Sequence, residues 1–155
     1  MDMDKSTIES LVRQVLMEKL SGVSHNQCDY VREVAPGGVI AVKVPTVKVD
    51  ESNRMDTGTP SDIVYTKDLF TLEESPRLGC GVMEMTKTTF DWHLNYDEID
   101  YVIEGSLSIV INGDTVTAGP GELILIPKGS SIKFSVPNYA RFIYVTYPAD
   151  WAGQA

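Results

Sequence analysis

The sequence predicts an all-β domain, folded as a sandwich or barrel, that follows a short N-terminal amphipathic α-helix. Three observations support this prediction: a helical period of apolar residues confined to the first twenty positions, many short β-branched runs after them, and glycines at turn-like intervals between the runs. No alternation of strands and helices is visible, so a parallel α/β sheet is excluded. We divide the 155 residues into a helix over 1–20, a linker over 21–35 and a β-barrel over 36–155.

The N-terminal segment carries its apolar residues on one face of a helix predicted over residues 6–20. These residues are Ile8, Leu11, Val12, Val15, Leu16 and Leu20. Ser6 and Glu9 have the spacing of a capping box, and Gly22 is a plausible stop. The apolar stripe either packs on the following domain or docks into a groove on another protein. The small, polar linker favours docking on another protein, because a core helix does not need a flexible tether.

β-Branched runs and turn signals place the strands. The longest run, Val39–Val49, alternates in part and contains Pro45, which marks an edge or a bulge. Asn112-Gly113 between two apolar runs predicts a hairpin, and the polar stretch Asp50–Asp62 predicts a loop. Further strands are predicted near residues 63–66, 79–88, 89–94, 98–104, 106–112, 115–118, 122–126, 132–136 and 141–147.

Charge and composition exclude several classes of partner. The net charge is −9, so neither nucleic acid nor an anionic membrane surface would attract the protein. No stretch approaches the roughly 18 apolar residues of a membrane span, and the acidic start of the chain is unlike a secretory signal. Cys28 and Cys80 are the only cysteines, which excludes a disulfide framework and indicates the cytoplasm. We therefore expect a cytoplasmic domain that binds a small-molecule ligand.

Two pairs of spaced residues indicate a particular barrel. Glu98 is followed after six residues by Gly105, and Gly121 is followed after five by Pro127, with Gly129 two residues later. Both spacings are those of the two cupin motifs, in which the glycines permit tight corners and the proline begins a turn. The pairing of the two motifs predicts a cupin-type jelly-roll β-barrel.

The metal-ligand positions of the cupin motifs are degenerate in this chain. Aligned on the motifs, they are occupied by Asp91, His93, Glu98 and Ile132. A cupin metal site uses three imidazoles and one carboxylate, whereas this set holds one imidazole and one hydrocarbon. We expect no tightly bound transition metal, although Asp91, His93 and Glu98 could form an open face for one.

Acidic and aromatic residues are concentrated between residues 90 and 104. The acids are Asp91, Asp97, Glu98, Asp100 and Glu104, and the aromatics among them are Trp92, Tyr96 and Tyr101. A two-residue period puts Asp100 on the same strand face as Glu98 and Tyr101 on the other face. Buried acids of this kind have raised pKa values and suit acid–base work or magnesium binding. Salt bridges at a dimer edge are the alternative interpretation.

Residues from about 56 to 151 resemble the EutQ family of ethanolamine-utilization proteins, which come from bacterial microcompartment operons and have a cupin fold that lacks the usual metal histidines. The runs that carry the resemblance are FDWHLNYDEIDYVIEG (90–105), ELILIPKGSSI (122–132) and ARFIYVTYPADW (140–151). The resemblance implies acetate kinase activity, a phosphotransferase reaction in which ATP and acetate give acetyl phosphate and ADP. It also implies that residues 1–20 act as an encapsulation peptide, which recruits the protein to shell or cargo proteins of the microcompartment.

The kinase interpretation requires carboxylates for Mg²⁺ and a cation for the phosphates of ATP. As catalytic residues we predict Glu98, Asp100, Asp97 and Lys128. As substrate-binding residues we predict Trp92, His93, Tyr96, Tyr101, Glu104 and Arg141. The sequence contains no phosphate-binding loop of the Gly-x-x-x-x-Gly-Lys-Ser/Thr type.

A non-catalytic binding or assembly protein is the alternative function. In that case the barrel would hold a small amine or organic acid; ethanolamine would suit Glu98 with Tyr96, Trp92 or Tyr101 through charge pairing and cation–π contact. In either case we expect a homodimer, because jelly rolls of this type expose an edge strand that a second copy can pair with. Val39–Val49 is the predicted edge strand.

Overall fold

The computed structural model describes residues 8–9, 12–13 and 28–154. The chain divides into two compact units, one ending at Lys48 and the other beginning at Val49. The helix predicted over residues 6–20 lies outside the described residues except at positions 8–9 and 12–13, and it stays a prediction. Among the described residues, no helix is long and apolar enough to cross a membrane.

The first unit contains a small hairpin. Strand β1 (Arg32–Val34) pairs antiparallel with β2 (Ile40–Val42), so a strand occupies the end of the predicted linker over 21–35. The long strand predicted over Val39–Val49 is wrong. Only its first part is a strand, because Pro45 has no N–H for a ladder and lies in a 3₁₀ turn, η1 (Val44–Thr46).

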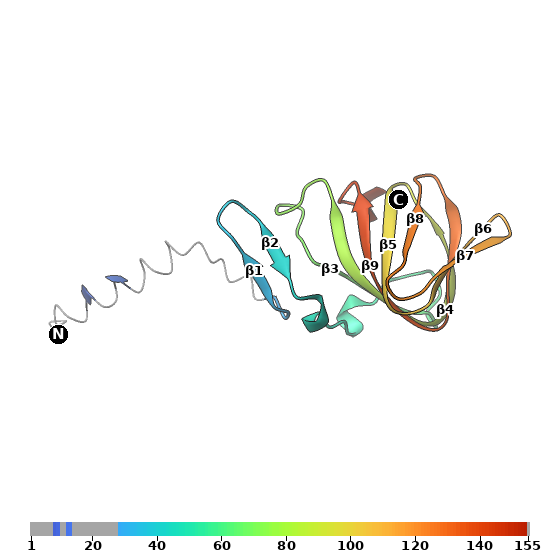
Figure 1. Ribbon diagram of the computed structural model, residues 1–155, viewed down its shortest axis with the longest axis horizontal. Coiled ribbons are helices and arrows are strands. Elements are labelled where there is room, and N and C mark those ends of the chain that lie inside the picture. The colour runs from blue at the N-terminus through green and yellow to red at the C-terminus, as the bar shows by residue number, and fades with distance from the viewer. Residues whose placement is uncertain (1–7, 10–11, 14–27, 155) are drawn as a thin grey trace. The chain divides into compact units, whose positions relative to one another are not determined.

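The second unit contains an antiparallel barrel, with a short 3₁₀ turn, η2 (Glu51–Asn53), before its first strand and another, η3 (Ala152–Gln154), after its last. Its strands are β3 (Ile63–Asp68), β4 (Gly79–His93), β5 (Asp97–Gly105), β6 (Leu107–Ile111), β7 (Asp114–Ala118), β8 (Leu123–Ile126) and β9 (Ser131–Tyr147). The neighbours run in the order β3-β4-β9-β5-β8, with β7 on β6 and β6 on β9 (Figure 1). The jelly-roll prediction is confirmed, and two pairs of predicted strands prove to be the continuous strands β4 and β9.

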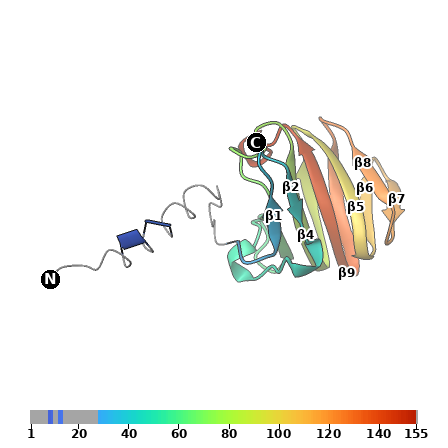
Figure 2. The same cartoon turned by 60° about the vertical axis from the view of Figure 1, so that its left-hand side comes forward.

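Strands β4 and β9 each run through both halves of the barrel. Residues 79–86 of β4 pair with 139–146 of β9, and residues 88–93 pair with 131–136. The register shifts at Lys87, which has a positive φ of 46°, and this bulge bends the strand from one half of the barrel into the other. Strand β5 pairs with the later part of β9 and β6 with its earlier part, so β9 lies between β4 and β5 in Figure 2.

Two turns confirm predictions made from glycines. Asn112 and Gly113 have φ values of 52° and 88° and join β6 to β7, as a type I′ hairpin requires. Gly105 has a φ of 77°, and a side chain on it would overlap the carbonyl oxygen of Tyr139. The glycine of the first cupin motif is therefore fixed by close backbone approach as well as by its conformation.

Alternation along β5 decides what faces the interior. Glu98, Asp100 and Val102 are buried, whereas Ile99 and Tyr101 are exposed. The predicted two-residue period is thus correct. The strand turns two carboxyl groups into a core otherwise built from apolar side chains, among them Met85, Leu94, Phe134, Phe142 and Tyr144.

Candidate functional site

The centre of the candidate site is a pair of buried carboxyl groups on the inner face of β5. Glu98 is 4% exposed and Asp100 is 0% exposed. In the ladders that flank β5, Glu98 lies opposite Thr146 of β9, and Asp100 lies opposite Tyr144. No partner on these two positions of β9 carries a positive charge.

Three of the four carboxyl oxygens of this pair are buried without a hydrogen-bond partner in the described part of the chain. The unpaired buried atoms are Oε1 of Glu98, both carboxyl oxygens of Asp100 and Oγ1 of Thr146. Burial raises the pKa of Glu98 to about 7, with Asp100 lowering it in part. Burial, with the Glu98 carboxylate beside it, also raises the pKa of Asp100 well above its usual value. Burial therefore favours the protonated form of both carboxyl groups.

A narrow inner cavity reaches Glu98 from the interior of the barrel. Its volume is about 10 Å³, the space needed for one water molecule. Met83, Phe134 and Tyr144 line it beside Glu98, and its other walls are Met55, Trp92, Tyr96 and Trp151. These last four residues also line a wider hollow of about 210 Å³ with His93, Asn95 and Ala152, which we call the vestibule. The inner cavity and the vestibule thus share an aromatic wall.

The aromatic residues of this wall use their polar atoms on one another and on Asp68. Trp92 donates from Nε1 to the Tyr96 hydroxyl at 2.8 Å. The Tyr144 hydroxyl donates to Oδ1 of Asp68 at 2.6 Å, and Nε1 of Trp151 lies 3.4 Å from the same oxygen. The Trp151 ring packs 6.0 Å from that of Tyr96 and 5.9 Å from that of Tyr144, centroid to centroid. The polar atoms of the wall therefore already have partners, and the wall offers a mainly apolar surface.

A second hollow, which we call the outer groove, has a volume of about 380 Å³ and lies on the surface of the barrel. Its polar residues are Asp91, His93, Asn112, Ser131 and Lys133. Lys133 pairs with Asp91 at 2.5 Å, and Nδ1 of His93 lies 2.8 Å from the Ser131 hydroxyl. The outer groove and the vestibule both include Trp92 and His93, so the two hollows adjoin at these residues.

The structure brings together only part of the predicted site. Glu98, Trp92 and Tyr96 line the inner cavity, and His93 lines the vestibule. Asp100 is buried on the same face of β5 as Glu98 but does not line either hollow.

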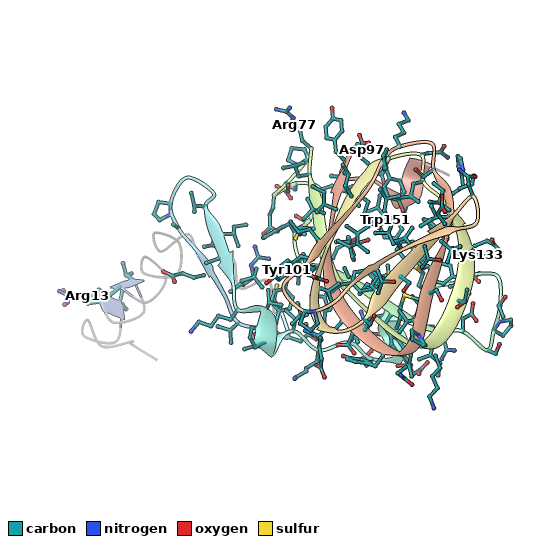
Figure 3. All side chains as sticks on the ribbon, turned by 45° about the vertical axis from the view of Figure 1, so that its right-hand side comes forward. Arg13, Arg77, Asp97, Tyr101, Lys133 and Trp151 are labelled. Carbon is teal, nitrogen blue, oxygen red and sulfur yellow. The ribbon has the colours of Figure 1, made fainter. Side chains whose placement is uncertain are left out.

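The other predicted residues lie elsewhere. Asp97 is exposed and accepts a hydrogen bond from the backbone N–H of Lys128 at 2.9 Å. Tyr101 and Glu104 are exposed, and Arg141 pairs with Glu84. In Figure 3, Trp151 lies within the outline of the barrel, whereas Lys133 lies at its edge.

Several residues near Glu98 had not been predicted. Trp151 and Met55 reach the site from outside the strands, and no local pattern in the sequence marks them. Thr146 and Tyr144 could have been found only from the register between β5 and β9.

The degenerate cupin positions do not assemble into a metal centre. Among the described residues, no three His, Cys, Asp or Glu side chains are grouped to hold an ion. Asp91 is turned outward against Lys133, whereas Glu98 is inside the barrel. Ile132 lies opposite Trp92 in the ladder and contributes a hydrocarbon to the core. The open Asp91, His93 and Glu98 face that the sequence allowed is thus not formed.

Comparison with known proteins gives consistent results. A family described as "Ethanolamine utilisation protein EutQ" matches residues 3–153. "Acetate kinase EutQ" of Clostridioides difficile (strain 630) is 67% identical over 153 residues, which are 99% of this chain and 97% of that protein. "Acetate kinase EutQ" of Salmonella typhimurium (strain LT2) is 37% identical over 95% of this chain, and the match spans 63% of the longer Salmonella protein.

Solved structures show the same relationship. The structure of the Clostridium difficile EutQ protein superposes with a TM-score of 0.81 at 71% identity, covering 83% of this chain and 93% of that one. The cupin domain of Schizosaccharomyces pombe Cnp3 superposes with a TM-score of 0.54 at 15% identity, over 82% of this chain and 93% of that one. At this low identity the second comparison shows the cupin fold alone.

Proposed function

Since the chain belongs to the EutQ family of ethanolamine utilisation proteins, we propose that it is an acetate kinase of ethanolamine catabolism. In this reaction a carboxylate oxygen of acetate attacks the terminal phosphorus of ATP, the bond to the bridging oxygen breaks, and acetyl phosphate and ADP are formed. The observation that carries the proposal is the near end-to-end match with the Clostridioides difficile acetate kinase.

The two adjoining hollows support an assignment of the substrates. We place the phosphates of ATP in the outer groove, where Lys133 and His93 supply positive charge and a hydrogen-bond donor. We place acetate in the vestibule, close to His93. Phosphoryl transfer depends mainly on holding donor and acceptor in line, and hollows that share Trp92 and His93 would allow that.

Magnesium fits the outer groove better than the barrel interior. Mg²⁺ prefers six oxygen ligands and usually keeps several waters, with one or two carboxylates and the substrate phosphates. Asp91 is an exposed carboxylate in the groove and would hold such an ion, which would neutralise charge on the phosphates. Of Glu98 and Asp100, which the sequence suggested as Mg²⁺ ligands, only Glu98 borders the inner cavity, and this cavity has space for one water-sized group only.

The proposed reaction needs no general base. Acetate is already ionised at neutral pH, so its oxygen can attack without losing a proton. The buried acid pair therefore has no proton-transfer step in this assignment.

An acetate kinase assay with variants tests this assignment. With Mg²⁺, ATP and acetate, we expect acetyl phosphate and ADP in equal amounts. Lys133→Met should lower kcat/KM for ATP by about tenfold or more, because a charge-assisted contact to phosphate is lost. Lys67→Met on β3 is the matched control and should leave the rate nearly unchanged.

Two outcomes would change the proposal. If Lys128→Met lowers kcat/KM for ATP as much as Lys133→Met does, the nucleotide binds at the turn before β9 instead. A chain that binds small molecules but yields no acetyl phosphate would support the non-catalytic alternative.

We also propose that the protein works in the cytoplasm at the microcompartment, to which residues 1–20 recruit it, and that it is a homodimer. The homodimer proposal is supported by β3, which is the terminal strand of its sheet and whose outer edge pairs only in part, with Arg54 and Met55. Fusing residues 1–20 to a fluorescent protein should produce recruitment to microcompartments, and light scattering should give the mass of two chains.

A further inference from the structure

The buried acid pair has no role in the proposed kinase reaction and no cation to balance it. The salt bridges within the described ranges include Glu84 with Arg141 and Asp91 with Lys133, but none that involves Glu98 or Asp100. A buried carboxylate without a partner costs free energy and is retained where a ligand completes it. The pair therefore calls for an occupant that donates hydrogen bonds and carries positive charge.

The size of the inner cavity limits what this occupant can be. With a volume of about 10 Å³, it admits one group of the size of a water molecule beside Glu98. A hydrated Mg²⁺ ion is too large, and the apolar walls supply too few oxygens for a bare one. A primary ammonium group has nearly the size of water and offers three N–H donors.

The vestibule extends this cavity in a way that suits a short chain attached to the ammonium group. Its volume of about 210 Å³ leaves room for several heavy atoms. Its aromatic residues, Trp92, Tyr96 and Trp151, also line the inner cavity. Aromatic faces attract a cation through their quadrupole and pack well against methylene groups.

We propose that the barrel binds a small primary amine, with its ammonium group in the inner cavity against Glu98 and its short chain between Trp92, Tyr96 and Trp151. Oε1 of Glu98 accepts one N–H bond, and Thr146, which lies opposite Glu98, carries another unpaired oxygen. Asp100 lies deeper on the same face of β5 and adds to the demand for positive charge. No covalent step is involved.

Titration of the full chain with three small ligands tests the proposal. Ethanolamine is the primary amine, ethylene glycol is its neutral counterpart, and choline carries the same charge on a group too large for the inner cavity. Both tryptophans of the chain line the vestibule, so tryptophan fluorescence reports binding. We expect saturable binding of ethanolamine. The affinities for ethylene glycol and for choline should each be lower by at least about tenfold.

Either of two results would overturn the proposal. Equal binding of ethylene glycol would show that the charge is not recognised. Equal binding of choline would show that the ligand does not enter the inner cavity. The titration uses no ATP or acetate, so its outcome is independent of the kinase assay.

A variant of Glu98 tests whether this carboxylate is the group that recognises the ammonium charge. Glu98→Gln keeps the shape of the side chain and should weaken ethanolamine binding about tenfold or more. Asp114→Asn is the matched control, because it removes one exposed negative charge from the β6–β7 hairpin. The affinity of this variant for ethanolamine should stay within about twofold of that of the wild type. Unchanged binding by a folded Glu98→Gln protein would contradict the proposal. The three-ligand comparison on the wild type stands if that variant does not fold.

Discussion

The acids of β4 and those inside β5 face the same strand, β9, and have different partners there. Glu84 lies opposite Arg141 and pairs with it, and Asp91 lies opposite Lys133 and pairs with it. Glu98 lies opposite Thr146, and Asp100 lies opposite Tyr144, neither of which is charged. The comparison separates two uses of a carboxylate in one barrel. The acids of β4 are completed within the chain, whereas those of β5 await a partner from outside.

The largest effect on stability is expected where a half-buried pair is broken. Arg141→Met leaves Glu84 without its cation, and their side chains are only 12% and 19% exposed in the native protein. We expect a loss of about 3–5 kcal/mol in the free energy of unfolding, measured by denaturant titration. The Glu84→Gln/Arg141→Met double variant should recover much of this loss. A loss below about 1 kcal/mol would place the pair with ordinary surface salt bridges.

A smaller effect of opposite sign is expected for the unpaired acids. The pKa of Glu98 is raised to about 7, so the native state binds more protons than the unfolded chain between the ordinary glutamate pKa and that value. Stability should therefore fall as pH rises from about 4.5 to 7 and stay low above it. Glu98→Gln should flatten this dependence and raise the melting temperature at pH 8 by several degrees. A melting temperature of Glu98→Gln below that of the wild type at pH 8 would show that Glu98 has a stabilising partner.

The smallest effect is expected at the exposed pair of the outer groove. The side chains of Asp91 and Lys133 are 82% and 49% exposed. Asp91→Asn should change the free energy of unfolding by less than about 1 kcal/mol, because solvent screens an exposed pair. Thermal melts at low and high salt measure the change. A larger loss would mean that this pair, like Glu84–Arg141, holds the sheet together.

Local chemistry was enough to predict most of the barrel. Glycines and the Asn112-Gly113 turn marked the ends of strands, and the two-residue period correctly turned Glu98 and Asp100 inward. The continuity of β4 and β9 was missed, because the bend at Lys87 is held by pairing between segments about fifty residues apart. No residue type at that position announces a bulge.

The site was predicted only in part, because local patterns find residues that are near one another in sequence and miss those that only the fold brings together. Glu98, Trp92 and Tyr96 line one cavity and are close in sequence, and Asp100 follows Glu98 on the same face of β5, so a local pattern could find them. Trp151 reaches the cavity from beyond the last strand, and its place depends on how the chain leaves β9. The outward position of Tyr101 followed from the same period, so its inclusion among the binding residues was inconsistent with that pattern.

Strands β4 and β9 run through both halves of the barrel, and this limits how a ligand can enter. Because each of these strands is hydrogen-bonded to neighbours in both halves of the barrel, the two halves cannot move apart without breaking these ladders. Trp151 lies outside every strand and lines the inner cavity together with Glu98. Access to Glu98 should therefore depend on movement of side chains in the cavity wall, such as Trp151, and not on separation of the two halves of the barrel.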